Sequence, residues 1–99
     1  MKIEFELQGV CFEWNDKKAL LNLQNHGINF EEACEVFLDP FVKSVDSEIV
    51  ESEMRDKIIG MTEIWQVLLV VYTERDHDIF RIISARLATS KERRQYEKQ

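Results

Sequence analysis

The side chains of this chain whose type and spacing most directly suggest chemistry are cationic. These side chains belong to Lys17, Arg55, Arg75, Arg81 and Arg86, which lie beside segments expected to form strands or the start of a helix. A guanidinium group matches phosphate oxygens bidentately and stays charged at any working pH. Several such groups in one site can hold a phosphodiester and stabilise the extra charge of its transition state. The pattern favours a phosphate-bearing ligand, although a salt bridge with an acidic neighbour is the simpler explanation for any single arginine.

Cleavage of RNA would suit such a site, because RNA supplies its own nucleophile in the 2′-hydroxyl and requires neither a metal ion nor a covalent intermediate. The general base could be a carboxylate, His26 or a perturbed lysine, and the residues leave that choice open. The sequence contains no G-x-S-x-G, P-loop or H-E-x-x-H motif. Its two histidines, His26 and His77, could bind a metal ion only together with several carboxylates, so we expect no metal site and no cofactor.

A β-hairpin is expected to position most of the arginines. The apolar run 65–72 predicts a buried strand, and the run 79–85 predicts a second, antiparallel strand after a polar turn. A two-residue turn at Asp76-His77 would place Arg75 and Arg86 on one face and Arg81 on the other. A three-residue turn would instead bring Arg81 to the face of Arg75. We expect the pairing of Arg75 with Arg86.

The N-terminal half predicts strands followed by two helices. Residues 2–7 and 10–14 alternate as strands do, and Asn15 is a suitable N-cap for a helix over about 16–25 that ends at Gly27. The apolar side of this helix would be formed by Leu20, Leu21 and Leu23. A second helix is expected to begin at Asn29, which with Glu32 resembles a capping box, and to end at Asp39-Pro40.

The rest of the chain predicts an α+β domain. Strands near 41–46 and 54–62, joined by an acidic segment, precede the hairpin, and Thr89 with Glu92 forms a capping box for a short helix from Ser90 to about Glu97. Helices segregated from a mostly antiparallel sheet indicate the α+β class. The 99 residues are enough for one domain.

The charge is unevenly distributed. Residues 1–78 carry 7 basic and 17 acidic side chains, a net of −10, whereas residues 79–99 carry 6 basic and 2 acidic, a net of +4. The basic end could meet phosphate or an acidic partner, or it could face the acidic part within the fold. No apolar run reaches membrane-spanning length and no signal peptide is evident, so we expect a soluble cytoplasmic protein. Cys11 and Cys34 are expected to be buried thiols.

Two sets of motifs together resemble the BrnT toxin family over about residues 10–97. The first half carries Phe12-Glu13-Trp14-Asn15, Lys17, Asn22, His26-Gly27, Phe30-Glu31-Glu32-Ala33, Val36-Phe37 and Asp39-Pro40. The second half carries Glu53-x-Arg55, Ile59-Gly60, the run from Leu69 to Arg75, Arg81-Ile-Ile-Ser-Ala-Arg86 and Glu92-Arg93-x-x-Tyr96. No single motif is specific, but the set is.

The resemblance implies one RelE-like domain over residues 1–99. Its sheet would be mostly antiparallel and four-stranded, or slightly larger, with two N-terminal helices and one short C-terminal helix. It also implies a ribonuclease toxin of a type II toxin–antitoxin system that cuts RNA and arrests translation. The implied partner is a BrnA-like antitoxin with a ribbon-helix-helix part, in a heterotetramer with the toxin.

Carried over by position, the resemblance implies catalytic roles for Lys17, Arg75 and Arg86 and substrate-binding roles for Arg55, Arg81 and His26. The alternative is a non-catalytic binding module whose basic end docks an acidic partner or DNA. That module would bind in a salt-sensitive way without cleaving RNA.

Overall fold

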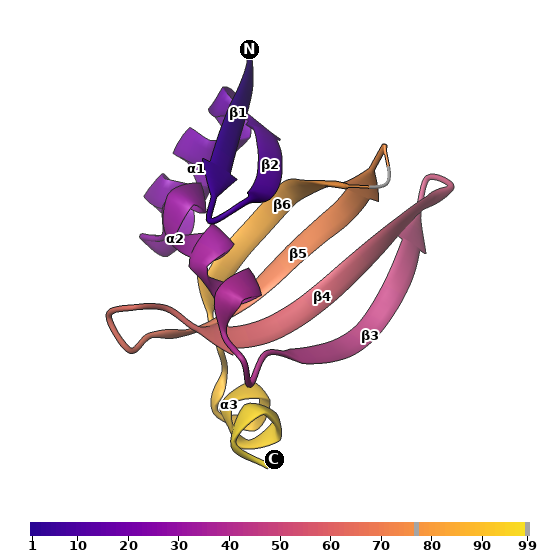
Figure 1. Ribbon diagram of the computed structural model, residues 1–99. Coiled ribbons are helices and arrows are strands. Elements are labelled where there is room, and N and C mark those ends of the chain that lie inside the picture. The colour runs from indigo at the N-terminus through magenta and orange to yellow at the C-terminus, as the bar shows by residue number, and fades with distance from the viewer. Residues whose placement is uncertain (77, 99) are drawn as a thin grey trace.

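The sheet is the main element of the fold and has six strands within the described residues, 1–76 and 78–98 of the computed structural model. The strand order is β1-β2-β6-β5-β4-β3, and only β2 and β6 pair in parallel (Figure 1). Along the chain the elements are β1 (Lys2–Leu7), β2 (Val10–Asn15), α1 (Asp16–His26), α2 (Phe30–Glu35), the 3-10 helix η1 (Val36–Leu38), β3 (Lys43–Val50), β4 (Glu53–Met61), β5 (Val67–Arg75), β6 (Ile79–Leu87) and α3 (Ser90–Glu97).

The expected sheet of four strands, or slightly more, with two N-terminal helices is wrong, although the α+β class and the mostly antiparallel pairing are correct. A hairpin of β1 and β2 precedes the helices, and β2 joins the main sheet by pairing in parallel with β6. Alternation of polar and apolar residues predicted both N-terminal strands. It could not show which strand they would pair with, because pairing partners far apart in sequence leave no local signal.

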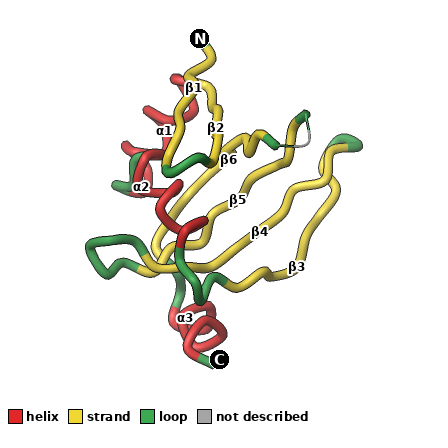
Figure 2. Tube along the Cα trace, in the orientation of Figure 1, coloured by secondary structure: helices red, strands yellow, loops and turns green. Residues whose placement is uncertain are grey.

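The helices α1 and α2 cover one face of the sheet on the side of β1, β2 and β6, and η1 follows them towards β4 (Figure 1). The main core lies beneath them and consists of Phe12, Trp14, Ile28, Phe30, Ala33, Cys34, Val36, Ile58, Leu68, Val70, Ile82 and Ala85. The strands β3 and β4 extend beyond this cover. The connection between β4 and β5, residues 62–66, projects from the end of β4 opposite to its turn with β3 (Figure 2).

Helix α1 is attached through an asparagine and not through leucines. Leu20, Leu21 and Leu23 are exposed, whereas Asn22 is buried. The Asn22 side-chain amide donates to the carbonyls of Ile28 (2.9 Å) and Ala85 (2.8 Å) and accepts from the amide of Ala85 at 3.1 Å. The predicted apolar side was therefore wrong. Asn22 satisfies backbone groups of the loop after α1 and of β6, which pairs with β2 only at residues 79–81.

The cap residues were predicted correctly. The Asn15 side chain accepts from the amides of Lys17 and Lys18, and Gly27 ends α1 in the left-handed conformation with φ 71°. The Asn29 side chain accepts from the Glu32 amide, and both halves of the Thr89–Glu92 capping box are formed.

Helix α3 packs on the face of the sheet opposite to α1. Its Tyr96 joins Ile59, Val67 and Leu69 in a second apolar cluster. The Tyr96 hydroxyl donates to Asp39 at 2.6 Å, and burial together with this bond raises the pKa of Tyr96 to about 12. Burial alone would raise the pKa of Asp39, but hydrogen bonds from Tyr96 and from the amides of Met61 and Phe41 lower it. This carboxylate therefore joins the end of η1, β4 and α3.

Three smaller expectations can also be compared with the fold. Cys34 is buried, as predicted, but Cys11 is exposed, because it lies on the face of β2 that no helix covers. Strand β3 continues through Val50, so most of the acidic segment that we expected to be a loop is strand. Among the described residues, none of the helices is long and apolar enough to cross a membrane.

The role of Asn22 can be tested by Asn22→Ala, with Asn25→Ala on the exposed side of the same helix as the control. Removing the amide leaves two carbonyls and one N–H of the backbone without partners, so we expect a loss of roughly 3 kcal/mol in the free energy of unfolding. Asn25→Ala should change it by less than about 0.5 kcal/mol. Urea denaturation measures both, and equal effects would show that the Asn22 bonds contribute little.

Candidate functional site

The arrangement of the arginines follows from how β6 pairs with β5. Arg75 lies opposite Ile79, so residues 76–78 connect the strands, and Thr73 lies opposite Arg81. Further along, Tyr72 faces Ile82 while Val71 faces Ser84, which makes Ile83 an extra residue in β6. Beyond this bulge Leu69 lies opposite Arg86. A bulge of one residue reverses the alternation of the strand that contains it.

As a consequence, Arg75, Arg81 and Arg86 all lie on one face of the sheet. One face of β5 carries residues 69, 71, 73 and 75. Residues that lie opposite each other on neighbouring strands point to the same face. The expected pairing of Arg75 with Arg86 on one face is confirmed. The turn of two residues on which it rested, and the opposite placement of Arg81, are wrong. His77, which we expected in that turn, lies outside the described residues.

Arg55 and Lys57 on β4 extend the same row, since Lys57 lies opposite Val71 of β5. We call the face with Arg55, Lys57, Arg75, Arg81 and Arg86 the cationic face. It is turned away from α1 and α2. Arg86 lies opposite Leu69, which is six residues from Arg75 along β5, or roughly 20 Å. The two arginines therefore cannot contact the same phosphate group. The cations form a track along the sheet and not one compact cluster.

Each arginine of the cationic face is paired with a carboxylate. Arg81 Nη1 contacts the buried Glu13 at 2.9 Å, and Arg75 Nη2 contacts Glu53 at 2.9 Å. Arg55 shares Glu53 through a longer contact of 3.6 Å from its Nε, and this buried nitrogen makes no hydrogen bond within the described residues. Two guanidinium groups therefore share one carboxylate. Acidic and basic residues do face each other within the fold, since Glu48 also lies opposite Arg55 on this face and contacts Lys57 Nζ at 3.7 Å.

Arg86 is held more firmly than the others. Its Nη1 and Nη2 contact the two carboxylate oxygens of Glu92 at 2.8 and 2.9 Å, and Nη1 also donates to the Leu87 carbonyl. Glu92 is itself fixed, since it accepts from the Thr89 amide in the capping box of α3. Hydrogen bonding to Arg86 lowers the pKa of Glu92, and the same bond raises the pKa of Arg86. Within the described contacts, the Arg86 Nε and one hydrogen of Nη2 have no partner.

A polar groove of about 440 Å³ lies beside Arg86, between α3 and the first part of β3. We call it the α3 groove. Its cations are Lys43, Lys57, Arg86 and Lys91, against the carboxylates of Asp46 and Glu92, and it is also lined by Ser44, Val45, Leu69, Thr89 and Gln95. Lys43 Nζ donates to the carbonyls of Gln95 (2.9 Å) and Lys98 (3.1 Å), and Lys57 Nζ lies 3.7 Å from Glu48. The excess of cations and the available donors of Arg86 still make this groove the part of the cationic face best suited to an anion.

The structure does not bring Lys17 and His26 to this groove. Both are exposed and lie at the two ends of α1, which packs on the opposite face of the sheet through Asn22 and Ala85. Their roles in catalysis and substrate binding stay predictions. Sequence reasoning missed Lys43, Lys57 and Lys91. Only Lys57 carried a usable signal, because it follows Arg55 at the alternate position of a predicted strand.

No group of three or more His, Cys, Asp or Glu side chains is placed to hold a metal ion within residues 1–76 and 78–98. The donors that converge on the cationic face are ammonium and guanidinium groups, which bind anions and not cations. The chemistry that this face offers is therefore the binding and charge stabilisation of an anion.

Fold and face together define an α+β protein with a row of cations along one exposed sheet face. The profile of the family described as "Ribonuclease toxin, BrnT, of type II toxin-antitoxin system" matches residues 14–92. The chain therefore belongs to the BrnT family of ribonuclease toxins, as its motifs suggested.

A solved structure supports the fold. The chain is similar to the Brucella abortus ribonuclease toxin BrnT, whose crystal structure was determined at 1.1 Å resolution, with a TM-score of 0.62 and 23% sequence identity. The similarity covers 78% of this chain and 94% of that one. A comparison with curated protein sequences finds no match.

The Arg86–Glu92 pair can be tested by Glu92→Gln. Because the folded pKa of Glu92 is lowered, its contribution to stability is present above its ordinary pKa of about 4.5 and is lost as the pH falls through the lowered value. At pH 7 we expect the variant to be less stable by about 1 kcal/mol. Denaturation as a function of pH should show this difference shrinking in acid. A difference independent of pH would mean that the ion pair does not contribute.

Proposed function

We propose that this chain is an endoribonuclease toxin that cleaves RNA without a metal ion, by attack of the 2′-hydroxyl on the adjacent phosphodiester. The observation that carries the proposal is the α3 groove, where Arg86 is fixed by Glu92 and keeps available donors, and which is also lined by Lys43, Lys57 and Lys91. Family membership supplies the substrate class. The toxin would act in the cytoplasm and arrest translation by destroying transcripts.

In the proposed reaction, the 2′-oxygen of the substrate forms a bond to phosphorus while the bond from phosphorus to the 5′-oxygen breaks. The 2′-hydroxyl loses its proton and the leaving 5′-oxygen gains one. The products are a 2′,3′-cyclic phosphate and a 5′-hydroxyl. Negative charge grows on the phosphoryl oxygens in the transition state, and fixed donors aimed at that charge accelerate the reaction because they need no reorganisation. Arg86 is assigned this role.

The rest of the cationic face would hold the RNA strand. Arg75, Arg81 and Arg55 lie along the sheet within roughly 20 Å of the groove, a distance that several nucleotides can span. Their pairing with Glu13 and Glu53 means that phosphates compete with carboxylates already in place. Binding should therefore weaken steeply with added salt.

The partner would be a BrnA-like antitoxin with a ribbon-helix-helix part, which masks the toxin and assembles with it as a heterotetramer. Membership of a type II toxin–antitoxin family implies a protein antitoxin. The BrnA-like identity and the stoichiometry belong to the proposal.

Cleavage of end-labelled RNA by the purified chain in EDTA tests the reaction. We expect cyclic phosphate ends, and we expect Arg86→Ala to lower kcat by roughly 100-fold or more because it removes a fixed donor to the transition state. Arg86→Lys should rescue little of this loss, since a lysine keeps the charge without the fork of donors.

Arg94→Ala is the matched control, because Arg94 is exposed on α3 and does not line the α3 groove. It should leave cleavage unchanged. RNA that binds in a salt-sensitive way but stays uncut at every enzyme concentration would instead favour the non-catalytic binding module. A folded, fully active Arg86→Ala variant would remove the assignment of Arg86.

A further inference from the structure

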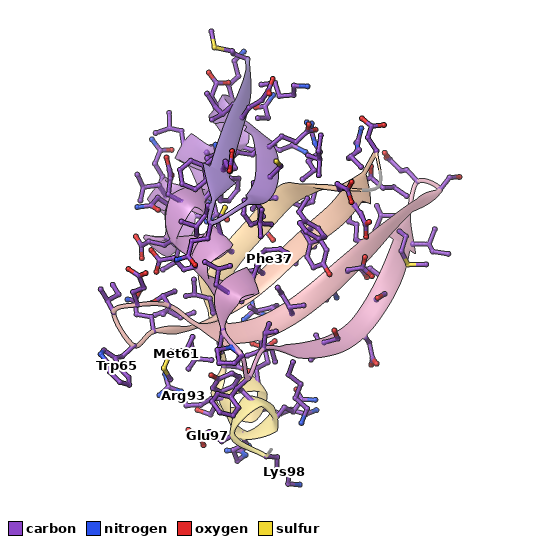
Figure 3. The ribbon with its side chains drawn as sticks, in the orientation of Figure 1. Phe37, Met61, Trp65, Arg93, Glu97 and Lys98 are labelled. Atoms are coloured by element: carbon purple, nitrogen blue, oxygen red, sulfur yellow. The ribbon has the colours of Figure 1, made fainter. Side chains whose placement is uncertain are left out.

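The face of the sheet that carries the helices is only partly covered by them. Towards β3 and β4 it is open, and Phe37 projects over it from η1 (Figure 3). Three half-buried aromatic rings border this open part. Phe37 lies 4.9 Å from Tyr72 and 5.1 Å from Phe80, and Tyr72 lies 5.5 Å from Phe80, all between ring centroids. These rings pack against the main core and remain partly exposed.

Two exposed apolar side chains continue the surface towards the edge of the sheet. Ile49 of β3 and Met54 of β4 lie directly opposite each other and are 69% and 51% exposed. Both point to the face that carries the helices, because the flanking pair Glu48 and Arg55 points to the cationic face. We call the surface formed by Phe37, Ile49, Met54, Tyr72 and Phe80 the open aromatic face.

Carboxylates border the open aromatic face. Asp56 lies opposite Tyr72, and Glu74 lies opposite Phe80. Burial raises the pKa of Tyr72, and the charges of Asp56 and Glu74 raise it further, so both carboxylates are close to the ring. Asp56 accepts from the Ser47 hydroxyl at 2.8 Å. Within the described residues, neither carboxylate forms a salt bridge, in contrast to Glu13, Glu53 and Glu92 on the other face.

The aromatic rings and the carboxylates together determine which kind of partner the open aromatic face can bind. The charges of Asp56 and Glu74 repel the phosphates of RNA, so the substrate is an unsuitable occupant. A second copy of this chain is unsuitable too, because a two-fold contact would place the same carboxylates against each other in a chain of net charge −6. A partner that offers apolar side chains to the rings and Lys or Arg to Asp56 and Glu74 complements the surface in both respects.

The dimensions indicate one helix. The surface spans β6, β5, β4 and β3, which are three inter-strand spacings or roughly 14 Å across. A helix with its side chains is about 10–12 Å wide. We propose that the open aromatic face binds one amphipathic, basic helix of the antitoxin, and that this contact is separate from the cationic face. The inference rests on the proposed antitoxin partner and adds where it binds and by what chemistry.

Two double variants test the surface without changing a buried residue. Asp56→Asn with Glu74→Gln removes the two charges, and Ile49→Ser with Met54→Ser removes the exposed apolar contacts. We expect each double variant to raise the Kd for the purified antitoxin about tenfold or more. The control is Glu31→Gln with Glu97→Gln, which changes the net charge by the same amount at exposed sites elsewhere. It should raise the Kd less than about threefold. RNA cleavage by the free toxin should be the same in all three.

Hydrogen exchange of the complex locates the contact independently. Protection of residues 47–50, 53–56 and 72–74 is expected. Wild-type affinity in both test variants, equal weakening in the control, or protection confined to other segments would overturn the inference while leaving the proposed ribonuclease intact. A chain that neither cleaves RNA nor binds the antitoxin would instead refute the proposed function.

Discussion

The register of β6 against β5 is the constraint on which the rest of the candidate site depends. The extra residue Ile83 brings Arg86 to the same face as Arg81, although an odd separation would place them on opposite faces of a regular strand. The anchoring of α1 has a different origin. Asn22 hydrogen-bonds both backbone groups of Ala85, which lies beyond residues 79–81, the part of β6 that pairs with β2.

Charge pairing reconciles a basic face with an acidic chain. Each of Arg75, Arg81 and Arg86 has a carboxylate partner, so the fold is not strained by a row of like charges. The same pairing fixes the positions of the guanidinium groups before a ligand binds. Glu92 holds Arg86 at two nitrogens while being held itself by the start of α3. A fixed donor loses little entropy on meeting a phosphate, which suits stabilisation of a transition state more than tight binding of the ground state.

Local signals in the sequence predicted the local structure well. Caps at Asn15, Asn29 and Thr89 and the hairpin strands were found because each depends on residues within a few positions of one another. What failed depends on contacts distant in sequence. The pairing of β2 with β6 added strands to the sheet, and the bond of Asn22 to Ala85 left Leu20, Leu21 and Leu23 exposed. The α3 groove was invisible for the same reason, since Lys43, Arg86 and Lys91 meet only after β3 and α3 are in place.

The two faces of the sheet thus differ in chemistry. One carries cations paired with carboxylates, and the other carries aromatic rings beside Asp56 and Glu74, which form no salt bridge within residues 1–76 and 78–98. The most direct measurement is the structure of the chain bound to a short RNA whose 2′-hydroxyls are methylated, so that it cannot be cut. Phosphates should contact Arg86 and Lys57 in the α3 groove, with the strand continuing along the cationic face towards Arg81 and Arg75. RNA bound instead on the helix side, around Lys17 and His26, would contradict the assignment of the site.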